Sequence, residues 1–426
     1  MIRSYLLFLL RCGRVALKGD WRYHGWLAFL FIVSLVGLNA YVKQLVHGLA
    51  ITDLNNDVSW GVYIANFTFM VGIADAAVML AIPVYIYRNK SLSDLVIFGQ
   101  LLAVAAIIMS LAFVVVDLGR PDRFLHLIPG IGKMNFPESM LSWDVIVLNG
   151  YLLLSVYICG HLLYSRYRGH EPRAWFYVPF VLFSVFWAVS LHAVTAFLYV
   201  GLGGKPFWNT AIVGPRFIAS AFVSGPALVI LAFQCIRRVT AYKIPDQAIL
   251  TLRSIVQVAM FVNIFLLLNE LFKEFYTDNL HVSAAKFLYF GLHGHYSLVP
   301  WIWTAVVFNF TAMILLALPQ SRSLKYLNVA CCLAIVGIWI EKGMGMVVPG
   351  FIPTSLGDIT DYTPTFNETL ICFGIWAFGL LCYTLFIRMS LPVLEGKFTF
   401  SNAGDWKNRD DVRLGQAVSR TSNPSS

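Results

Sequence analysis

Ionisable side chains stand alone inside long apolar runs of this sequence. Asp75 interrupts "WGVYIANFTFMVGIADAAVMLAI", His192 lies in "WAVSLHAVTAFLYVG", and Glu270 follows the leucines of "NIFLLLNELFKEF". An ionisable group in an apolar environment is unfavourable unless it has a partner or a task, so such positions are candidates for ligand binding or proton transfer. The alternative for His192 and Asp75 is a purely structural hydrogen bond to a neighbouring helix.

A second set of ionisable residues forms one compact motif, "DLGRPDRFLH", directly after a run of valines. Glycine and proline within the motif end the preceding apolar run. Two arginines alternate with two aspartates, which favours a folded, hydrogen-bonded cap over a simple charged flank of a helix. The ionisable members are Asp117, Arg120, Asp122, Arg123 and His126.

The elements that carry these residues are predicted to be membrane-spanning helices. The chain has 426 residues, 58% hydrophobic and 12% charged, whereas soluble proteins have about 25% charged residues. Its apolar runs are continuous and reach the ~18 residues of a membrane helix, unlike the short alternating strands of a barrel. The sequence therefore predicts an all-α polytopic membrane protein. The ten predicted spans are 25–46, 60–87, 94–116, 142–165, 174–201, 211–236, 249–276, 296–318, 323–342 and 366–391.

The predicted domain organisation is simple. Residues 1–24 form an N-terminal segment with an interfacial helix, residues 25–391 form the transmembrane domain, and residues 392–426 form a flexible tail. Lys and Arg in the connecting segments and at the adjoining ends of the spans number 21 on one side and 7 on the other. By the positive-inside rule both termini are expected in the cytoplasm, in a prokaryotic cytoplasmic membrane. The net charge of +9 is then explained by topology and contact with the lipid bilayer, and no nucleic-acid partner is expected.

Helical geometry predicts where the polar side chains lie. A rise of 1.5 Å per residue places Asn66, Arg216 and Glu270 roughly 8–10 Å below the outer face, and Asp75 roughly 22 Å deep. At 100° per residue, polar side chains share one face of three spans, and these faces are expected to point into the bundle. The three sets are Asn39, Lys43 and His47; Ser184, His192, Thr195 and Tyr199; and Asn263, Glu270 and Glu274.

Such a layer fits the chemistry of a quinone. A quinone ring needs a hydrogen-bond donor at each carbonyl, which His and Tyr can provide, and a proton route, which carboxylates can provide. A haem b needs two axial histidines at matched depth, and only His192 is deep, so no haem is expected. The seven cysteines show no metal-ligand spacing, so no iron–sulfur cluster is expected in this chain either.

Several motifs together resemble the NrfD/polysulfide-reductase family of integral membrane subunits, over roughly residues 25–390. They are "SWGVYIANFTFMVGIADAA", "DLGRPDRFLH", "SMLSWDVIVLNGYLL", "SLHAVTAFLYV" and "PRFIASAFVSGPAL". The length is similar to the ten-helix members of hydrogenase and sulfite-reduction complexes. The resemblance implies a subunit that binds menaquinone or ubiquinone and has no redox cofactor of its own. It also implies a role in sulfur metabolism, with electrons exchanged with a periplasmic iron–sulfur ferredoxin-like subunit.

The resemblance further implies a multihaem cytochrome and other membrane or cytoplasmic redox subunits as partners, so the chain is not expected to be catalytic alone. In shorter members, an Asn and a His hold the quinone near the start of a helix that is similar to residues 60–87. Asn66 is present in the matching region, residues 63–67, and the His is not. The motif "DLGRPDRFLH" is expected to be a lid braced by Asp117 and Arg120. The predicted quinone-binding residues are Tyr63, Asn66, Asp117, Arg120, His126 and His192.

Asp75 and Glu270 are the predicted proton-transfer residues. Two other classes of function remain open from the residues alone. An ion-coupled secondary transporter would use the same two carboxylates for its coupling ions, although no repeat of interrupted helices is evident. A passive membrane anchor would leave the quinone chemistry to another subunit.

Overall fold

The computed structural model describes residues 2–86, 92–128, 130–276, 282–354 and 357–400. This part of the chain contains helices and connecting segments and no named strand. It includes ten helices that are long and apolar enough to cross a membrane. The predicted all-α polytopic fold is therefore confirmed.

The predicted spans agree with the long helices to within a few residues at most ends. Shorter elements are α1 (Ile2–Ala16), α10 (Val282–Phe290), α13 (Met344–Val347) and the 3-10 turns η1 (Gly48–Ile51) and η4 (Pro121–Leu127). The long helices are α2 (Trp21–His47), α3 (Val62–Ala74) continued by α4 (Ala76–Ala81) and a π-turn (Ile82–Ile86), α5 (Val96–Asp117), α6 (Met140–Tyr167), α7 (Ala174–Val200), α8 (Val213–Val239), α9 (Asp246–Tyr276), α11 (Val299–Ala317), α12 (Leu324–Lys342) and α14 (Phe366–Leu394).

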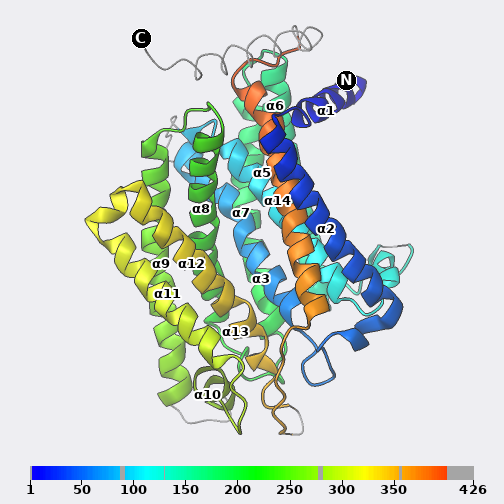
Figure 1. Ribbon diagram of the computed structural model, residues 1–426, viewed down its shortest axis with the longest axis vertical. Coiled ribbons are helices and arrows are strands. Elements are labelled where there is room, and N and C mark those ends of the chain that lie inside the picture. The colour runs from blue at the N-terminus through cyan, green and yellow to red at the C-terminus, as the bar shows by residue number, and fades with distance from the viewer. Residues whose placement is uncertain (1, 87–91, 129, 277–281, 355–356, 401–426) are drawn as a thin grey trace.

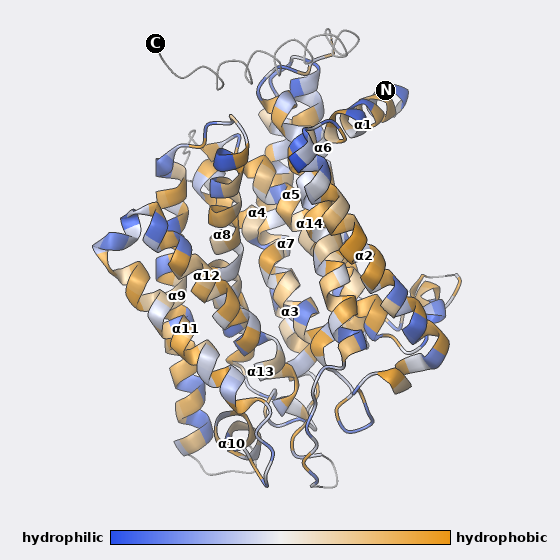
Figure 2. Cartoon of the chain, in the orientation of Figure 1, coloured by the Kyte–Doolittle hydropathy of each residue, from blue (hydrophilic) through white to orange (hydrophobic). Residues whose placement is uncertain are grey.

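The spans pack as two groups of four helices with a flanking pair (Figure 1). The first bundle consists of α3 with α4, α5, α6 and α7, and the second bundle consists of α8, α9, α11 and α12. Helices α3 and α8 pack against each other and join the two bundles, while α2 and α14 form a pair that packs on α5. Figure 2 shows apolar residues along the middle of the long helices and hydrophilic residues towards their ends. This distribution fits a protein that crosses a bilayer.

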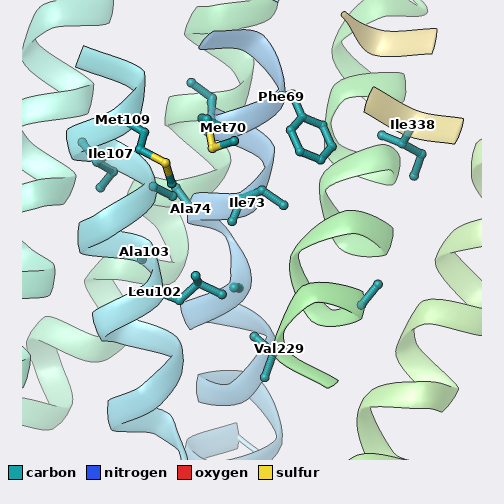
Figure 3. Packing of buried hydrophobic residues seen from close by; sticks show 14 of the residues in the cluster. Phe69, Met70, Ile73, Ala74, Leu102, Ala103, Ile107, Met109, Val229 and Ile338 are labelled. Carbon is teal, nitrogen blue, oxygen red and sulfur yellow. The ribbon is translucent and has the colours of Figure 1, made fainter. Parts of the chain in front are cut away.

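Helix α3 lies at the centre of the molecule. In the most apolar 18-residue stretch of its span, 94% of the residues are buried, whereas in that of α2 only 17% are buried. Figure 3 shows Met70 and Ala74 of α3 facing Met109 and Ala103 of α5, with Val229 of α8 nearby. A helix that is apolar on every side is expected to be buried on every side, and α3 is the helix that brings residues of both bundles together.

The predicted inward face of α2 is wrong. Asn39, Lys43 and His47 are all exposed. The inward face carries smaller or uncharged residues, and it places Gly37 against Gly374 of α14. A Cβ atom on Gly37 would lie 2.5 Å from the Gly374 Cα, so this close approach of two helix backbones requires glycine. Small residues therefore set the contact face of α2, as they commonly do between membrane helices.

The ninth span is longer than predicted. After α12, Gly343 leads into α13 and a 3-10 turn (Pro349–Phe351), and together they form one apolar span, Leu324–Phe351. Lys342, which the charge count assigns to a connecting loop, lies inside this span and is 5% exposed. The sequence favours an end at Lys342 because Lys usually flanks a membrane helix.

The two ends of the described chain lie at the same end of the molecule (Figure 1). We call this the α1 end, and we call the opposite end, where α3 begins and η4 lies, the η4 end. The N-terminal segment predicted before the first span is a separate helix, α1. Most of the predicted tail, residues 401–426, lies outside the described residues.

Candidate functional site

A cleft of about 470 Å³ opens at the η4 end. Pockets for small ligands typically measure about 300–1,000 Å³, so this cleft can accept an aromatic ring with its substituents. One wall comes from the end of α2 and η1, and the other comes from the start of the "DLGRPDRFLH" motif. The lining residues are Tyr41, Gln44, Leu45, Gly48, Leu49, Leu118, Gly119, Arg120, Pro121 and Asp122.

Gln44 forms the polar floor of this cleft. Its Nε2 donates a hydrogen bond to the Val116 carbonyl at 2.7 Å, and its Oε1 accepts one from the Tyr63 hydroxyl, also at 2.7 Å. The neighbouring Asp117 has a buried Oδ1 atom without a hydrogen-bond partner among the described residues. Of the predicted residues, the structure places Arg120 in the lining of the cleft. Tyr63 does not line it but donates a hydrogen bond to the lining residue Gln44, and Asp117 precedes the lining residue Leu118 in the chain. The structure adds Gln44, which the sequence analysis missed.

The "DLGRPDRFLH" motif includes the 3-10 turn η4, and the arginine–carboxylate pair in it differs from the predicted brace. Arg120 donates hydrogen bonds from Nε and Nη2 to the two carboxylate oxygens of Asp122, each at 3.0 Å. These hydrogen bonds lower the pKa of the Asp122 carboxyl below its usual value. The brace is thus the pair Arg120–Asp122, not Asp117 with Arg120. His126 lies in η4, is exposed, and is not among the residues that line the cleft.

Asn66 holds three helices together. Its Oδ1 accepts hydrogen bonds from Trp339 Nε1 at 3.0 Å and Trp376 Nε1 at 2.9 Å, and its Nδ2 donates to the Val62 carbonyl at 2.8 Å. These contacts connect α3 with α12 and α14. Asn66 is not among the residues that line the cleft.

A buried pair, Asp75 and His192, lies where α3 passes into α4. His192 Nδ1 is 3.2 Å from Asp75 Oδ2 and 3.1 Å from the Ala188 carbonyl oxygen. Both neighbours are acceptors, so Nδ1 carries the proton. Asp75 Oδ1 and His192 Nε2 have no hydrogen-bond partner among the described residues. The pair therefore retains one free acceptor on each side chain inside the membrane.

The predicted polar face of α7 is confirmed, because Ser184, His192, Thr195 and Tyr199 are all buried. Thr195, one turn after His192, donates a hydrogen bond from Oγ1 to Asp144 Oδ1 at 2.9 Å. Asp144 is 2% exposed and was missed because it stands close to the start of its span, where a carboxylate usually meets water. The polar face of α7 thus contacts two buried carboxylates of the first bundle, Asp144 through Thr195 and Asp75 through His192.

The second bundle contains a buried ion-pair cluster. Arg216 of α8 pairs with Glu270 of α9 and with Glu341 of α12, in the second case at 2.5 Å. Glu341 also accepts a hydrogen bond from Asn309 Nδ2 at 2.6 Å. One guanidinium therefore joins two carboxylates from different helices. The predicted polar face of α9 is confirmed, because Asn263, Glu270 and Glu274 are buried.

A small cavity adjoins this cluster. Its volume is about 30 Å³, and a site of roughly 10–15 Å³ on this measure holds one water molecule. It has room for a few water molecules and not for a quinone ring. Both side-chain amide atoms of Asn263 and Oε2 of Glu274 lack protein partners among the described residues, and both residues line the cavity. Buried polar atoms of this kind are commonly satisfied by water.

Lys342 connects this cavity with the Asp75–His192 pair. Its Nζ donates a hydrogen bond to the Phe217 carbonyl at 3.4 Å and lies 4.4 Å from the centre of the Phe217 ring. A Cβ atom on Gly72 would lie 3.2 Å from Nζ, so the ammonium sits against α3 one turn before Asp75. Asp75 and Lys342 interact electrostatically. The central ionisable groups therefore come from three helices, α3, α7 and α12.

These features define a polytopic helical membrane protein with a ring-sized cleft at one end and a buried series of ionisable groups across two bundles. Among the described residues, no group of three or more His, Cys, Asp or Glu side chains could hold a metal ion. Residues 50–349 match the family described as polysulphide reductase, NrfD, and the chain belongs to this family. The resemblance drawn from the sequence motifs is confirmed at this level.

The chain is also similar over most of its length to membrane proteins of several redox complexes. A putative membrane subunit of a dimethyl sulfoxide reductase from Halobacterium salinarum is 26% identical, over 84% of this chain and 88% of that protein. An Hdr-like menaquinol oxidoreductase integral membrane subunit from Archaeoglobus fulgidus is 24% identical, over 88% and 94%. A probable Ni/Fe-hydrogenase 2 b-type cytochrome subunit from Escherichia coli is 24% identical, over 83% and 88%.

Proposed function

We propose that this chain is the quinone-interacting membrane subunit of a respiratory oxidoreductase complex. It binds menaquinone or ubiquinone and exchanges electrons with an iron–sulfur ferredoxin-like partner on the periplasmic side. Membership of the NrfD family and the similarity to a subunit named for menaquinol support this function. The observation that carries it is the cleft at the η4 end, which has the volume and the hydrogen-bonding groups that a quinone ring needs.

The residues of the cleft have complementary tasks. The second N–H of the Gln44 amide and the Arg120 guanidinium can donate hydrogen bonds to the two quinone carbonyls, and Tyr63 fixes the orientation of Gln44. Leu45, Leu49 and Leu118 provide apolar contact for the ring and the isoprenoid tail. Asp117 does not line the cleft but directly precedes the lining residue Leu118, and its Oδ1 has no hydrogen-bond partner among the described residues, so it is assigned to accept a proton from a quinol hydroxyl. His126, exposed on η4, is assigned to the partner-facing surface.

Replacing Gln44 by Leu tests the cleft. The side chain keeps its approximate volume and loses the donor, and one hydrogen bond contributes about 0.5–1.5 kcal/mol. We therefore expect the Kd of a menaquinone analogue, titrated into the purified chain, to rise by about threefold to tenfold. Gln234→Leu is the matched control, because Gln234 is also a hydrogen-bonded glutamine on a membrane-spanning helix, paired with Asn328 in the second bundle and away from the cleft. Equal affinity in the Gln44 variant and the native chain would place the quinone elsewhere.

The buried ionisable groups are proposed to carry protons. Oxidation of a quinol releases two electrons and two protons, and the electrons pass to the partner subunit. Asp75 and Glu270 are the proton-transfer residues of this proposal, with His192 acting through its contact to Asp75 and Lys342 lying between the two carboxylates. Asn66 acts as a positioning residue that fixes α3 against α12 and α14.

The membrane orientation is part of the proposal. The excess of Lys and Arg at the α1 end supports cytoplasmic termini, which places the cleft and η4 on the periplasmic side of a prokaryotic cytoplasmic membrane. We expect a fluorescent reporter that folds only in the cytoplasm to be active after Ser426. The same reporter inserted after Gly130, in the segment following η4, is expected to be dark. Fluorescence from the second fusion and none from the first would reverse this orientation.

Within this function, we infer that the complex serves sulfur metabolism and that the chain is a DsrP-type subunit of a sulfite-reduction complex, DsrMKJOP. The support is the similarity of its long N-terminal region, "GLNAYVKQLVHGL" followed by "DLNNDVSWGVYIANF", to ten-helix subunits of this kind. Purification from the native membrane and identification of the associated subunits tests this inference. Partners of another pathway, without a multihaem cytochrome, would contradict it.

A further inference from the structure

Among the described residues, helix α1 packs against the rest of the protein through one of its faces. Tyr5 and Phe8 pack on aromatic residues of α6, with ring centres 5.3 Å apart for Tyr5 and Tyr164 and 4.8 Å apart for Phe8 and Tyr167. Arg11 Nη1 donates a hydrogen bond to the Tyr167 hydroxyl at 2.8 Å. These contacts fix the rotation of α1 about its axis, and therefore fix which side chains point away from the protein.

The connection between α1 and α2, residues 17–20, fixes the direction of α1, and we call it the elbow. Asp20 caps α2 by accepting a hydrogen bond from the Tyr23 backbone N–H, and the Tyr23 hydroxyl donates to the Ala16 carbonyl at 2.6 Å. Arg388 of α14 donates to the Lys18 carbonyl at 3.0 Å. As a result α1 leaves the bundle sideways and runs across the direction of the long helices (Figure 1). A helix that lies in the surface of a membrane has this orientation.

The outward surface of α1 and the elbow is both apolar and basic. Leu6, Leu10 and Leu17 are 54%, 64% and 62% exposed. At 100° per residue, Arg3 and Arg14 lie 20° apart on one side of the helix, next to the leucine stripe. The exposed cations of this surface are Arg3, Arg14, Lys18 and Arg22. The acid among residues 2–22 is Asp20, which is used as the cap of α2.

We propose that α1 and the elbow form a binding surface for anionic phospholipids. The leucines enter the boundary between head groups and acyl chains, and the arginines and Lys18 contact lipid phosphates and extend to the water beyond. Trp21, which is 79% exposed, lies at the same level, where tryptophan is enriched in membrane proteins. The excess of positive charge selects anionic over zwitterionic head groups. This proposal does not depend on the quinone site.

Native mass spectrometry of the full-length chain tests this surface. Phosphatidylglycerol and phosphatidylethanolamine are titrated separately into the purified protein, and bound copies are counted. Each cation near an anionic surface contributes about 1 kcal/mol, or roughly fivefold in affinity. A variant with Arg3→Gln, Arg14→Gln and Lys18→Gln is expected to bind phosphatidylglycerol at least about tenfold more weakly and phosphatidylethanolamine unchanged.

Two further variants make the test decisive. Replacing both arginines by lysine, Arg3→Lys with Arg14→Lys, is expected to retain the preference, because the charge is kept. Removing three exposed cations at the opposite end, with Lys43→Gln, Arg123→Gln and Lys133→Gln, is expected to leave the preference unchanged. A native chain without preference for phosphatidylglycerol, or a triple α1 variant that keeps the full preference, would overturn the proposal and leave a protein partner as the occupant of this face.

Discussion

Replacing Asp75 by Asn is expected to lower the quinol-dependent turnover of the assembled complex by about 100-fold, because a positioned acid–base group contributes about 10²–10⁴-fold. Asn keeps the shape of the side chain and can still contact His192, but it cannot take up and release a proton. The affinity for quinone is expected to remain unchanged, since Asp75 does not line the cleft. Turnover and quinone affinity are measured on the same complex at equal subunit content.

Asp246→Asn provides the matched control. Asp246 carries the same carboxylate, pairs with Arg237 at 2.6 Å, and lies in an exposed position at the α1 end. It should retain native turnover. If the Asp75 variant also retains native turnover, the protons travel by another route and the Asp75–His192 contact is structural.

The membrane spans could be predicted because their signal is local. Each apolar run is long enough to cross a bilayer, and its ends coincide with polar or helix-breaking residues. The exception, the ninth span, fails for a physical reason. Lys342 ends α12 and looks like the end of the membrane span as well, yet the span continues and the Lys342 side chain is accommodated inside the protein against Phe217.

The inward polar faces of α7 and α9 could also be predicted, because a charged or polar stripe facing lipid is unfavourable. The same rule failed for α2, which lies at the edge of the molecule. There the glycine contact between Gly37 and Gly374 decides the inward face. The residues of α2 that line the cleft are therefore Tyr41, Gln44 and Leu45, which are uncharged, and not the ionisable Lys43 and His47.

Contacts between distant helices could not be predicted from one sequence. Depth estimates from each span separately place His192 roughly 13 Å and Asp75 roughly 22 Å below the outer face, yet the two side chains lie 3.2 Å apart. Such estimates assume untilted helices that begin at the same level, and the packing of α3 against α7 does not follow that assumption. The hydrogen bonds from Trp339 and Trp376 to Asn66 depend in the same way on how α12 and α14 pack around α3.

The cluster around Arg216 combines a residue that the sequence singles out with partners that only the packing reveals. Glu270 is a candidate because an acid inside a span must have a partner or a task, and the structure provides the partner. That partner is shared with Glu341, so the cluster can lose one charge and still retain one ion pair. A group with two alternative partners suits a proton-transfer role, because protonation of one carboxylate leaves Arg216 paired with the other.

Replacing Arg216 by Met is expected to lower the free energy of unfolding by about 3–5 kcal/mol, because it leaves two buried carboxylates without their cation. The side chains of Arg216, Glu270 and Glu341 are 17%, 9% and 7% exposed, so water can compensate only in part. The measurement is unfolding of the purified chain in mixed detergent micelles, followed by circular dichroism. Arg237→Met, which removes the half-buried partner of the exposed Asp246, is the control and should change the free energy by no more than about 1 kcal/mol. A triple variant, Arg216→Met with Glu270→Gln and Glu341→Gln, should recover most of the loss, since the unpaired charges are gone. If the Arg216 variant is as stable as the control, the cluster does not hold the second bundle together.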